Sequence, residues 1–346
     1  MATFTRPHVI FNPAAAGGNT GRAQGTILKA LEEEFPHGFS LDVTTENGQA
    51  TALTRRALSN EAGLIVVVGG DGTCNEVLNG FFEHRKPIRP SARLGFISSG
   101  TGEDASRNLG LPAGLKAQIR RLHRGRRLLD VGLVRYTASD GTTHERLFLN
   151  DCQLGIAGRV VQRVTPTLKK LGGFLAYGIA STLTALTYNG HLLTIKCDRD
   201  EPIEGQFLGV AAANGRFAGG GMDFAPHSRI DDGKLDVIMI RDQSKINRLL
   251  NFPKIYSGRH IDMPWVISKK VQKVRITSDG PVPLEADGEF LGYLPCEIRV
   301  LPRILPIASS LSPRRIKPSW DQNRCHALLF ILHRYLSDVP ALTHRQ

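Results

Sequence analysis

The stretch Ile65–Glu76 constrains the fold of this 346-residue chain more than any other segment. A β-branched run, Ile65–Val68, stops at two glycines, and Asp71, Gly72 and Thr73 follow before a helical pattern of apolar residues begins. This order predicts a strand, a tight turn and the start of a helix. Glycines let another molecule approach the backbone closely, and the first turn of a helix offers free N–H groups to an anion. The turn therefore fits a phosphate group.

Asp71 narrows the kind of phosphate that this turn would hold. A carboxylate repels a phosphate unless a divalent cation or a proton lies between them, so the pattern indicates a magnesium–nucleotide complex rather than bare phosphate. The alternative is an ordinary strand-to-helix corner in which Asp71 only caps the helix.

Two further strands are predicted to end in loops of small residues. Strand His8–Phe11 leads into the glycine-rich segment Asn12–Gly21, and strand Leu94–Ile97 leads into Ser98–Arg107, where Asp104 would lie in the first turn of a helix. Such loops also occur in proteins that bind nothing there, and a plain helix cap is the alternative role of Asp104. A second aspartate at a strand end is, however, what metal-assisted phosphoryl transfer requires.

The spacing of these segments predicts a parallel sheet. Strand Leu41–Thr45 and helix Ala50–Leu58 separate the first strand from the one that begins at Leu64, and repeated strand–helix units imply right-handed crossovers. Ligands of such sheets bind beyond the carboxyl ends of the strands. The loop residues that we expect to gather in one crevice are Asn12, Thr44, Asp71 and Thr73.

The pattern changes near Leu128. Helical periodicity thins out and short alternating segments follow, which predicts a second, mostly antiparallel β domain with one helical excursion between about residues 160 and 188. Ser228–Asp236 carries an Asp-Asp-Gly turn that fits either a plain surface turn or an oxygen-coordinated cation. Glu285–Glu289 carries three carboxylates and fits either a solvated hairpin tip or a general base or metal ligand.

Composition limits the setting in which the chain works. The net charge of +12 indicates an anionic partner, which is a nucleic acid, a nucleotide or a membrane surface. The five cysteines are never in C-x-x-C spacing, which argues against a disulfide framework or a zinc site and favours the reducing cytosol. Polar residues interrupt the apolar-leaning stretch Phe174–Leu193, so we expect no membrane span. A last helix, Cys325–Leu336, would dock on the first domain or lie in a membrane interface.

Taken in this order, the motifs resemble the diacylglycerol kinase catalytic-domain family, which also holds sphingosine kinases, ceramide kinases and soluble bacterial lipid kinases. The segments that carry the resemblance are Asn12-Pro13 with the following glycines, Gly69–Glu76, Gly100-Thr101 with Asp104, Asp231–Asp236 and Asp287–Glu289. The match runs from about Val9 to Leu301. The glycine–aspartate loop alone is shared with NAD kinases, and the full series is far more specific.

The resemblance implies two domains with the active site in the cleft between them. The first is an α/β nucleotide-binding domain with a parallel sheet like those of phosphofructokinase and NAD kinase, formed by residues 1–128, to which residues 305–346 return. The second is a mostly antiparallel β-sandwich that receives the lipid, formed by residues 129–304.

The resemblance also implies residue roles. The residues that would contact ATP are Asn12, Pro13, Gly17, Thr44, Thr45, Gly69, Gly70, Gly72, Thr73, Glu76, Gly100 and Thr101. Asp71 and Asp104 would hold the catalytic Mg²⁺, and Glu289 would be the general base, with Asp287 as the alternative. A structural Mg²⁺ site would be formed by Asp232 with the carbonyl groups of Arg229 and Lys234.

One residue departs from the family pattern. Glu103 stands where the family usually has asparagine, and a glutamate only accepts hydrogen bonds and adds a negative charge beside the phosphates. We expect metal binding through Asp104 to survive this change, whereas the phosphate contacts of the loop are in doubt.

The function expected from these observations is transfer of the γ-phosphate of Mg-ATP to a lipid hydroxyl, with diacylglycerol as the expected lipid. The alternatives are a sphingoid-base, ceramide or phosphatidylglycerol kinase, an NAD kinase, and a non-catalytic relative that binds lipid or nucleotide. We expect a cytoplasmic protein that contacts anionic membranes peripherally and binds no nucleic acid, and the sequence leaves a homodimer open.

Overall fold

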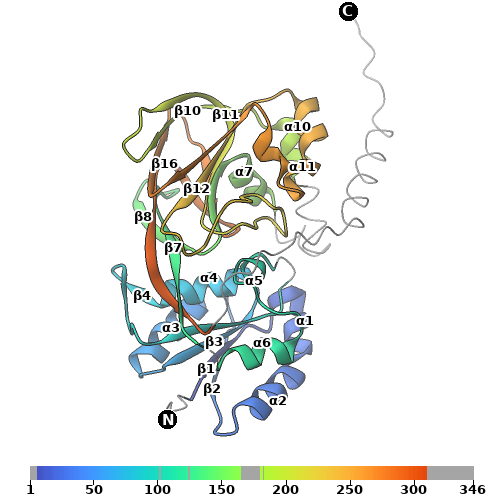
Figure 1. The fold of residues 1–346 in the computed structure, drawn as a ribbon, viewed down its shortest axis with the longest axis vertical. Helices are drawn as coiled ribbons and strands as arrows, with labels where there is room; N and C mark the ends of the chain where they lie inside the picture. The colour runs from blue at the N-terminus through green and yellow to red at the C-terminus, as the bar shows by residue number, and fades with distance from the viewer. Residues whose placement is uncertain (1–5, 101–102, 124, 165–179, 182, 310–346) are drawn as a thin grey trace, which may run out of the picture.

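The computed structural model describes residues 6–100, 103–123, 125–164, 180–181 and 183–309. Within them the elements form a lower part, blue to green in Figure 1, and an upper part, green to orange. The expected position Thr101, most of the 160–188 segment and the expected helix Cys325–Leu336 lie outside the described residues.

Four strands of the lower part pair in parallel in the order β2, β1, β3, β6. They are β1 (His8–Phe11), β2 (Ser40–Val43), β3 (Leu64–Gly69) and β6 (Arg93–Ser98). Every residue of β3 is buried, because its two faces serve two different cores. Ile65 and Val67 face one core and Val66 and Val68 the other. This double burial explains the unbroken β-branched run in the sequence.

Helices cover both faces of these strands. They are α1 (Asn19–Arg22), α2 (Gln24–Glu34), α3 (Gln49–Ser59), α4 (Asp71–Gly80), α5 (Asp104–Asn108) and α6 (Leu115–Arg121). Two short strands, β4 (Phe82–Glu83) and β5 (Lys86–Pro87), form a separate hairpin. Since α4 follows β3 and α5 is the first helix after β6, their first turns lie at the same edge of the sheet.

Two long strands join the lower part to the upper part. β7 (Arg127–Thr137) and β16 (Glu289–Ile307) pair antiparallel, and the end of β16 pairs in parallel with β6 through Ile307 and Leu94. All of these strands therefore belong to one 14-stranded sheet. The sequence predicts two domains but not this connection between their strands, because pairing at a single residue leaves no pattern in the sequence.

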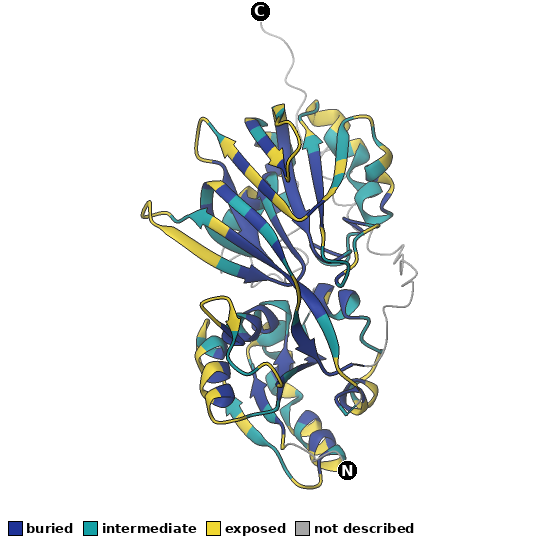
Figure 2. Cartoon of the chain, turned by 60° about the vertical axis from the view of Figure 1, so that its left-hand side comes forward, coloured by how far each residue is buried: buried dark blue, intermediate teal, exposed yellow. Residues whose placement is uncertain are grey.

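The upper part is antiparallel. Its further strands are β8 (Thr143–Phe148), β9 (Asp151–Gly155), β10 (His191–Cys197), β11 (Ile203–Ala213), β12 (Leu235–Arg241), β13 (Val266–Val271), β14 (Lys273–Ser278) and β15 (Pro283–Ala286). Strands β9, β11, β10, β14, β16 and β15 pair successively and return to β9, which closes a ring around a buried apolar core. Figure 2 shows buried residues running through the strands of both parts.

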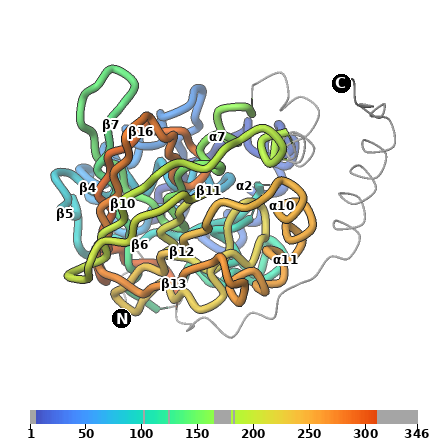
Figure 3. The backbone as a smooth tube through the Cα atoms, turned by 90° about the horizontal axis from the view of Figure 1, so that it is seen from above, coloured from blue at the N-terminus to red at the C-terminus, as the bar shows by residue number. Residues whose placement is uncertain are grey.

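Helices also border the upper part, and three of them are described from end to end. They are α7 (Ile156–Arg163), α10 (Lys245–Asn251) and α11 (Pro253–Tyr256). Ile255 of α11 packs against a small core that includes Ile238 and Ile240 of β12, and Figure 3 shows α10 and α11 beside β12 and β13. No helix among the described residues is long and apolar enough to cross a membrane.

Candidate active site

A cavity of about 1540 Å³ extends between the two parts. One end is polar and is bordered by the loops that follow β1, β3 and β6. The other end is lined mainly by apolar side chains of the upper part, namely Leu154, Ile156, Val160, Val161, Ile238, Ile240, Phe252, Ile255, Met263 and Trp265. A single space thus joins the predicted phosphate loops to an apolar wall.

The glycines of the polar end allow two loops to touch. A Cβ atom at Gly100 would lie 2.8 Å from the Cα atom of Gly70, which is closer than side chains approach a backbone. A Cβ atom at Gly69 would meet the hydroxyl of Thr73 at 2.8 Å, and that hydroxyl accepts a hydrogen bond from the amide of Asn12 at 2.8 Å. Glycine is therefore required at these positions for packing of the loops after β1, β3 and β6.

Asp71 and Asp104 lie next to each other and stabilise the turns around them. The Asp71 carboxylate accepts hydrogen bonds from the backbone N–H groups of Asp104 and Ala105, at 3.2 and 3.0 Å. Asp104 accepts hydrogen bonds from the N–H groups of Gly220 and Gly221 in the upper part, at 2.6 and 2.7 Å. These contacts tie α4, α5 and the upper part together at the cavity.

The same two carboxylates raise the question of a metal ion. Burial raises the pKa of Asp71, and burial together with the nearby charge of Asp71 raises the pKa of Asp104 to about 7. A pair of carboxylates whose charges repel is the donor set that a divalent cation stabilises, and Mg²⁺ usually needs only one or two carboxylates beside phosphates and water. The residues therefore fit a Mg²⁺ ion carried by a nucleotide.

Asp287 lies at the tip of the β15–β16 hairpin, so the segment Glu285–Glu289 is the hairpin that one of its two alternatives describes. Its carboxylate accepts hydrogen bonds from the N–H groups of Leu149 and Asn150 at 2.8 Å each, from that of Asp151 at 3.2 Å, and from the amide of Asn75 at 2.6 Å. This carboxylate anchors the β8–β9 loop to α4, and burial raises its pKa.

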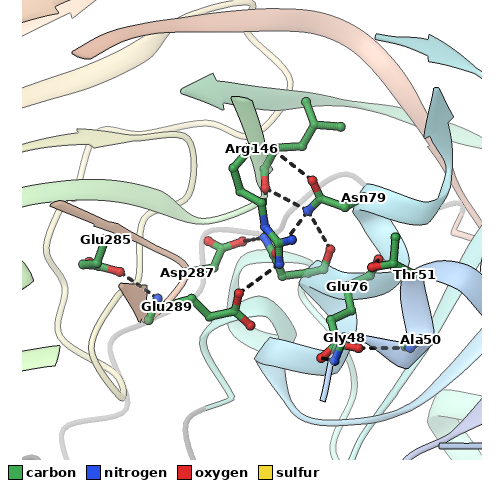
Figure 4. A network of polar contacts seen from close by, with 12 residues as sticks. Gly48, Ala50, Thr51, Glu76, Asn79, Arg146, Glu285, Asp287 and Glu289 are labelled. Carbon is green, nitrogen blue, oxygen red and sulfur yellow. Dashed lines mark hydrogen bonds and ion pairs between the residues drawn. The ribbon is translucent and has the colours of Figure 1, made fainter. Parts of the chain in front are cut away.

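Glu289 lies two residues further on and is more accessible, with 40% of its side chain exposed. It forms an ion pair of 2.9 Å with Arg146, which also donates a hydrogen bond of 2.7 Å to the side chain of Asn75 (Figure 4). A Cβ atom at Gly72 would lie 3.9 Å from the Glu289 carboxylate. The hairpin therefore brings Glu289 from the upper part to the glycine loop of the lower part.

Of the residues expected to contact ATP, six line the cavity, namely Asn12, Gly70, Gly72, Thr73, Glu76 and Gly100. The two expected ligands of the catalytic metal, Asp71 and Asp104, line it as well. Glu76 has a further role, because its carboxylate accepts hydrogen bonds from the N–H groups of Gly48 and Ala50 and so caps α3.

Other expected contacts lie beside the cavity rather than on its wall. The described residues that line the cavity do not include Pro13, Gly17, Thr44, Thr45 or Gly69. They include instead Ala15, Ala16, Asn47 and Gly48. Thr44 is buried beside Phe11, and Thr45 bonds to Gln49. The strand that the sequence extends to Thr45 ends at Val43, so the loop reaches the cavity with later residues.

At the turn where a structural Mg²⁺ was expected, a lysine pairs with the aspartates. Lys270 lies 2.9 Å from Asp232 and 2.8 Å from Asp236, so an ammonium group already neutralises the turn. Arg127 pairs with Asp231 in the same turn, at 2.7 Å. Among the described residues no group of three His, Cys, Asp or Glu side chains could hold a metal. Lys270 thus engages Asp232, the one side chain of the Mg²⁺ site expected from Arg229, Asp232 and Lys234, and that site stays a prediction.

Sequence reasoning missed several residues of the site. Arg146 was not singled out, because a single arginine in a short strand has no distinguishing pattern. Asp151 was not singled out either, and it lies buried beside Asp287 together with Glu285, which belongs to the carboxylate cluster noted in the sequence; both line the cavity. Burial and the charge of Asp287 raise the pKa of Asp151 to about 8, and burial and the charge of Asp151 raise that of Glu285.

Comparison with known proteins agrees with this geometry. Residues 6–134 match the family described as the diacylglycerol kinase catalytic domain, and residues 152–309 match the YegS C-terminal NAD kinase beta sandwich-like domain. The second match identifies the ring of strands in the upper part as a β-sandwich domain.

Relatives match over most of their length. A "Diacylglycerol kinase" of Staphylococcus carnosus is 30% identical, over 84% of this chain and 90% of its own. A "Probable lipid kinase YegS-like" of Chromohalobacter salexigens is 32% identical, over 74% of this chain and 79% of its own. A crystal structure of a diacylglycerol kinase from Bacillus anthracis shares the fold, with a TM-score of 0.65 and 22% identity over 90% of this chain and 98% of that one. The chain therefore belongs to the diacylglycerol kinase catalytic-domain family and is an ATP-dependent lipid kinase.

Proposed function

We propose that this kinase phosphorylates the free hydroxyl of diacylglycerol. The observation that carries this proposal is the continuity of the cavity, which runs from the glycine loops to an apolar wall. A diacylglycerol has one hydroxyl beside two acyl chains, so its hydroxyl would face the glycine loops while the chains pack against the apolar side chains. The cavity is larger than the usual range of ligand pockets, as a two-chain lipid and a nucleotide together require.

The polar end would receive ATP. Backbone N–H groups at the start of α4 and the contact between Gly70 and Gly100 would hold the phosphates closely. Asp71 and Asp104 would hold Mg²⁺, which would neutralise phosphate charge when bound. We divide the chain accordingly into a nucleotide domain, residues 1–128 with the chain after 305, and a lipid domain, residues 129–304.

Glu289 would act as the general base. It would take the proton of the lipid hydroxyl, whose oxygen then bonds to the γ-phosphorus while the bond to the bridging oxygen breaks and ADP leaves. Arg146 supports this role, because its ion pair with Glu289 holds the carboxylate near Gly72. Asp287 is unsuited to it, since its carboxylate already accepts hydrogen bonds from four groups.

The proposed substrate also implies where the enzyme works in the cell. The substrate resides in a membrane, so the enzyme would act in the cytoplasm and contact the bilayer peripherally. The basic balance of the chain favours bilayers rich in anionic lipids.

A substrate panel tests the proposal. ADP release would be measured with diacylglycerol, monoacylglycerol, phosphatidylglycerol, sphingosine, ceramide and NAD, and mass spectrometry would identify each phosphorylated product. We expect phosphatidic acid from diacylglycerol at the highest kcat/KM. Preference for a sphingoid base, ceramide or phosphatidylglycerol would refute diacylglycerol as the substrate. If no compound of the panel causes ADP release, the proposed activity is refuted. The Glu289→Gln variant is the control for contaminating kinases.

A further inference from the structure

Helix α10 carries two large apolar side chains that the fold leaves in solvent. Ile246 and Leu250 stand one helical turn apart, and each is 70% exposed. The other large exposed apolar side chains of the described residues reach at most 53%. Two such neighbours on one face are unusual on a surface that meets only water.

The helix is held firmly, so this exposure belongs to the folded protein. Arg248 is almost completely buried, forms an ion pair with Asp242 and donates hydrogen bonds to the backbone carbonyls of Ala185 and Tyr188. At the start of the helix, Ser244 accepts a hydrogen bond from the N–H group of Asn247.

The opposite side of α10 belongs to the cavity. Asn247, Arg248 and Asn251 line it, as do Phe252 and Ile255 just after the helix. Asn247 is also exposed to solvent, so the cavity reaches the surface beside Ile246 and Leu250. This opening is at the apolar end, whereas the exposed Glu103 marks an opening at the phosphate end.

The charged side chains of α10 and the residues that follow it are all basic. Residues 243–259 include Lys245, Arg248, Lys254 and Arg259 but no aspartate or glutamate. Asp242 neutralises Arg248, while Lys245 and Arg259 are exposed. A second copy of this helix would be repelled by the like charge. The sequence 310–346 has six arginines and lysines against two aspartates, so its charge does not complement the helix either.

We infer that α10 docks the enzyme on an anionic bilayer. Ile246 and Leu250 enter the acyl region, Lys245 and Arg259 contact the headgroup phosphates, and the lipid passes Asn247 into the cavity. Apolar side chains flanked by cations are the combination that interfacial helices use. This inference rests on the proposed lipid-kinase function of the cavity, and it adds the surface through which the substrate arrives.

Vesicle co-sedimentation without ATP tests the surface independently of turnover. We expect the full-length Ile246→Ser/Leu250→Ser variant to bind vesicles of phosphatidylcholine and phosphatidylglycerol about tenfold or more weakly than the wild type. The matched control is Leu41→Ser/Val43→Ser, which removes two exposed apolar side chains from β2 and is expected to bind like the wild type. Lys245→Gln/Arg259→Gln is expected to weaken binding to these vesicles but not to phosphatidylcholine alone.

Turnover of a dispersed short-chain diacylglycerol separates this inference from the function itself. Since Ile246 and Leu250 do not line the cavity, their variant is expected to keep wild-type kcat/KM on this substrate and to lose turnover only on vesicles. Equal vesicle binding by the variant and the wild type would overturn the docking surface even if both are active. A wild-type dimer that this variant converts to monomer would also overturn it, in favour of a second copy as the occupant. Inactivity of the wild type on every lipid would instead refute the proposed function.

Discussion

Asp287 and Glu289 are two residues apart, and the structure predicts opposite consequences when each is replaced by its amide. Asp287→Asn is expected to destabilise the fold. The carboxylate accepts three backbone hydrogen bonds and one from Asn75, and an amide would turn an NH₂ group toward N–H donors. Losing about two charge-assisted bonds at ~1.5–3 kcal/mol each predicts a decrease of roughly 3–6 kcal/mol in the free energy of unfolding.

Glu289→Gln is expected to leave stability nearly unchanged. Its ion pair with Arg146 is partly exposed, and such pairs contribute at most about 1 kcal/mol. Loss of a general base, in contrast, lowers kcat by about 10²- to 10⁴-fold. The two variants therefore separate a residue that anchors the loop from one that takes part in the reaction.

Urea unfolding and ADP release on the same preparations measure both effects. The reasoning is refuted if Asp287→Asn unfolds at the wild-type urea concentration while its kcat falls, because Asp287 would then act in the chemistry. A Glu289→Gln variant with wild-type kcat would refute the assignment of the base. Asp287→Ala provides a second measurement, since it leaves the same backbone donors without any partner and should be at least as unstable.

Three further predictions concern the surroundings of the site. Gly100→Ala should raise KM for ATP about tenfold with little change in kcat, because its Cβ would force Gly70 away; an unchanged KM would contradict the loop contact. Lys270→Met leaves Asp236 buried without its cation and should lower the free energy of unfolding, measured in urea, by about 1–2 kcal/mol. Added Mg²⁺ should restore part of this stability. Unchanged stability of the variant would contradict the role of Lys270 as the neutralising cation. The folded-state pKa of Asp151, about 8, exceeds the ordinary value, so the native state binds more protons and its melting temperature should fall from pH 4 to 8; Asp151→Asn should flatten this profile.

The elements that the sequence predicts well are encoded locally. The β-branched run at Val66 and the two glycines after it mark a buried strand and a tight turn in any context, and the structure has β3 and α4 there. Asp104 likewise lies in the first turn of α5. Strand ends are encoded less sharply, which is why Thr44 and Thr45 were assigned to the crevice in place of Asn47 and Gly48.

The parts of the site that the sequence did not predict depend on contacts between distant residues. Arg146 meets Glu289 across 143 positions, and Asn75 meets Asp287 across 212. Neither arginine in a strand nor asparagine in a helix distinguishes such a contact from ordinary solvation. Lys270 is similar, because its pairing with Asp236 depends on the register of β12 against β13, which one sequence does not specify.

The distribution of charge at the cavity explains why the nucleotide should arrive with its metal. Asp71 and Asp287 accept hydrogen bonds chiefly from neutral backbone N–H groups, which stabilise a carboxylate without cancelling its charge. Arg107 pairs with Asp104 and Arg146 with Glu289, so these cations are already engaged. A free triphosphate would therefore meet a negative field at the polar end, whereas a Mg²⁺ ion held by Asp71 would supply the positive charge that offsets this repulsion. The carboxylates would thus select the magnesium complex of ATP, while the glycines determine how closely it can approach.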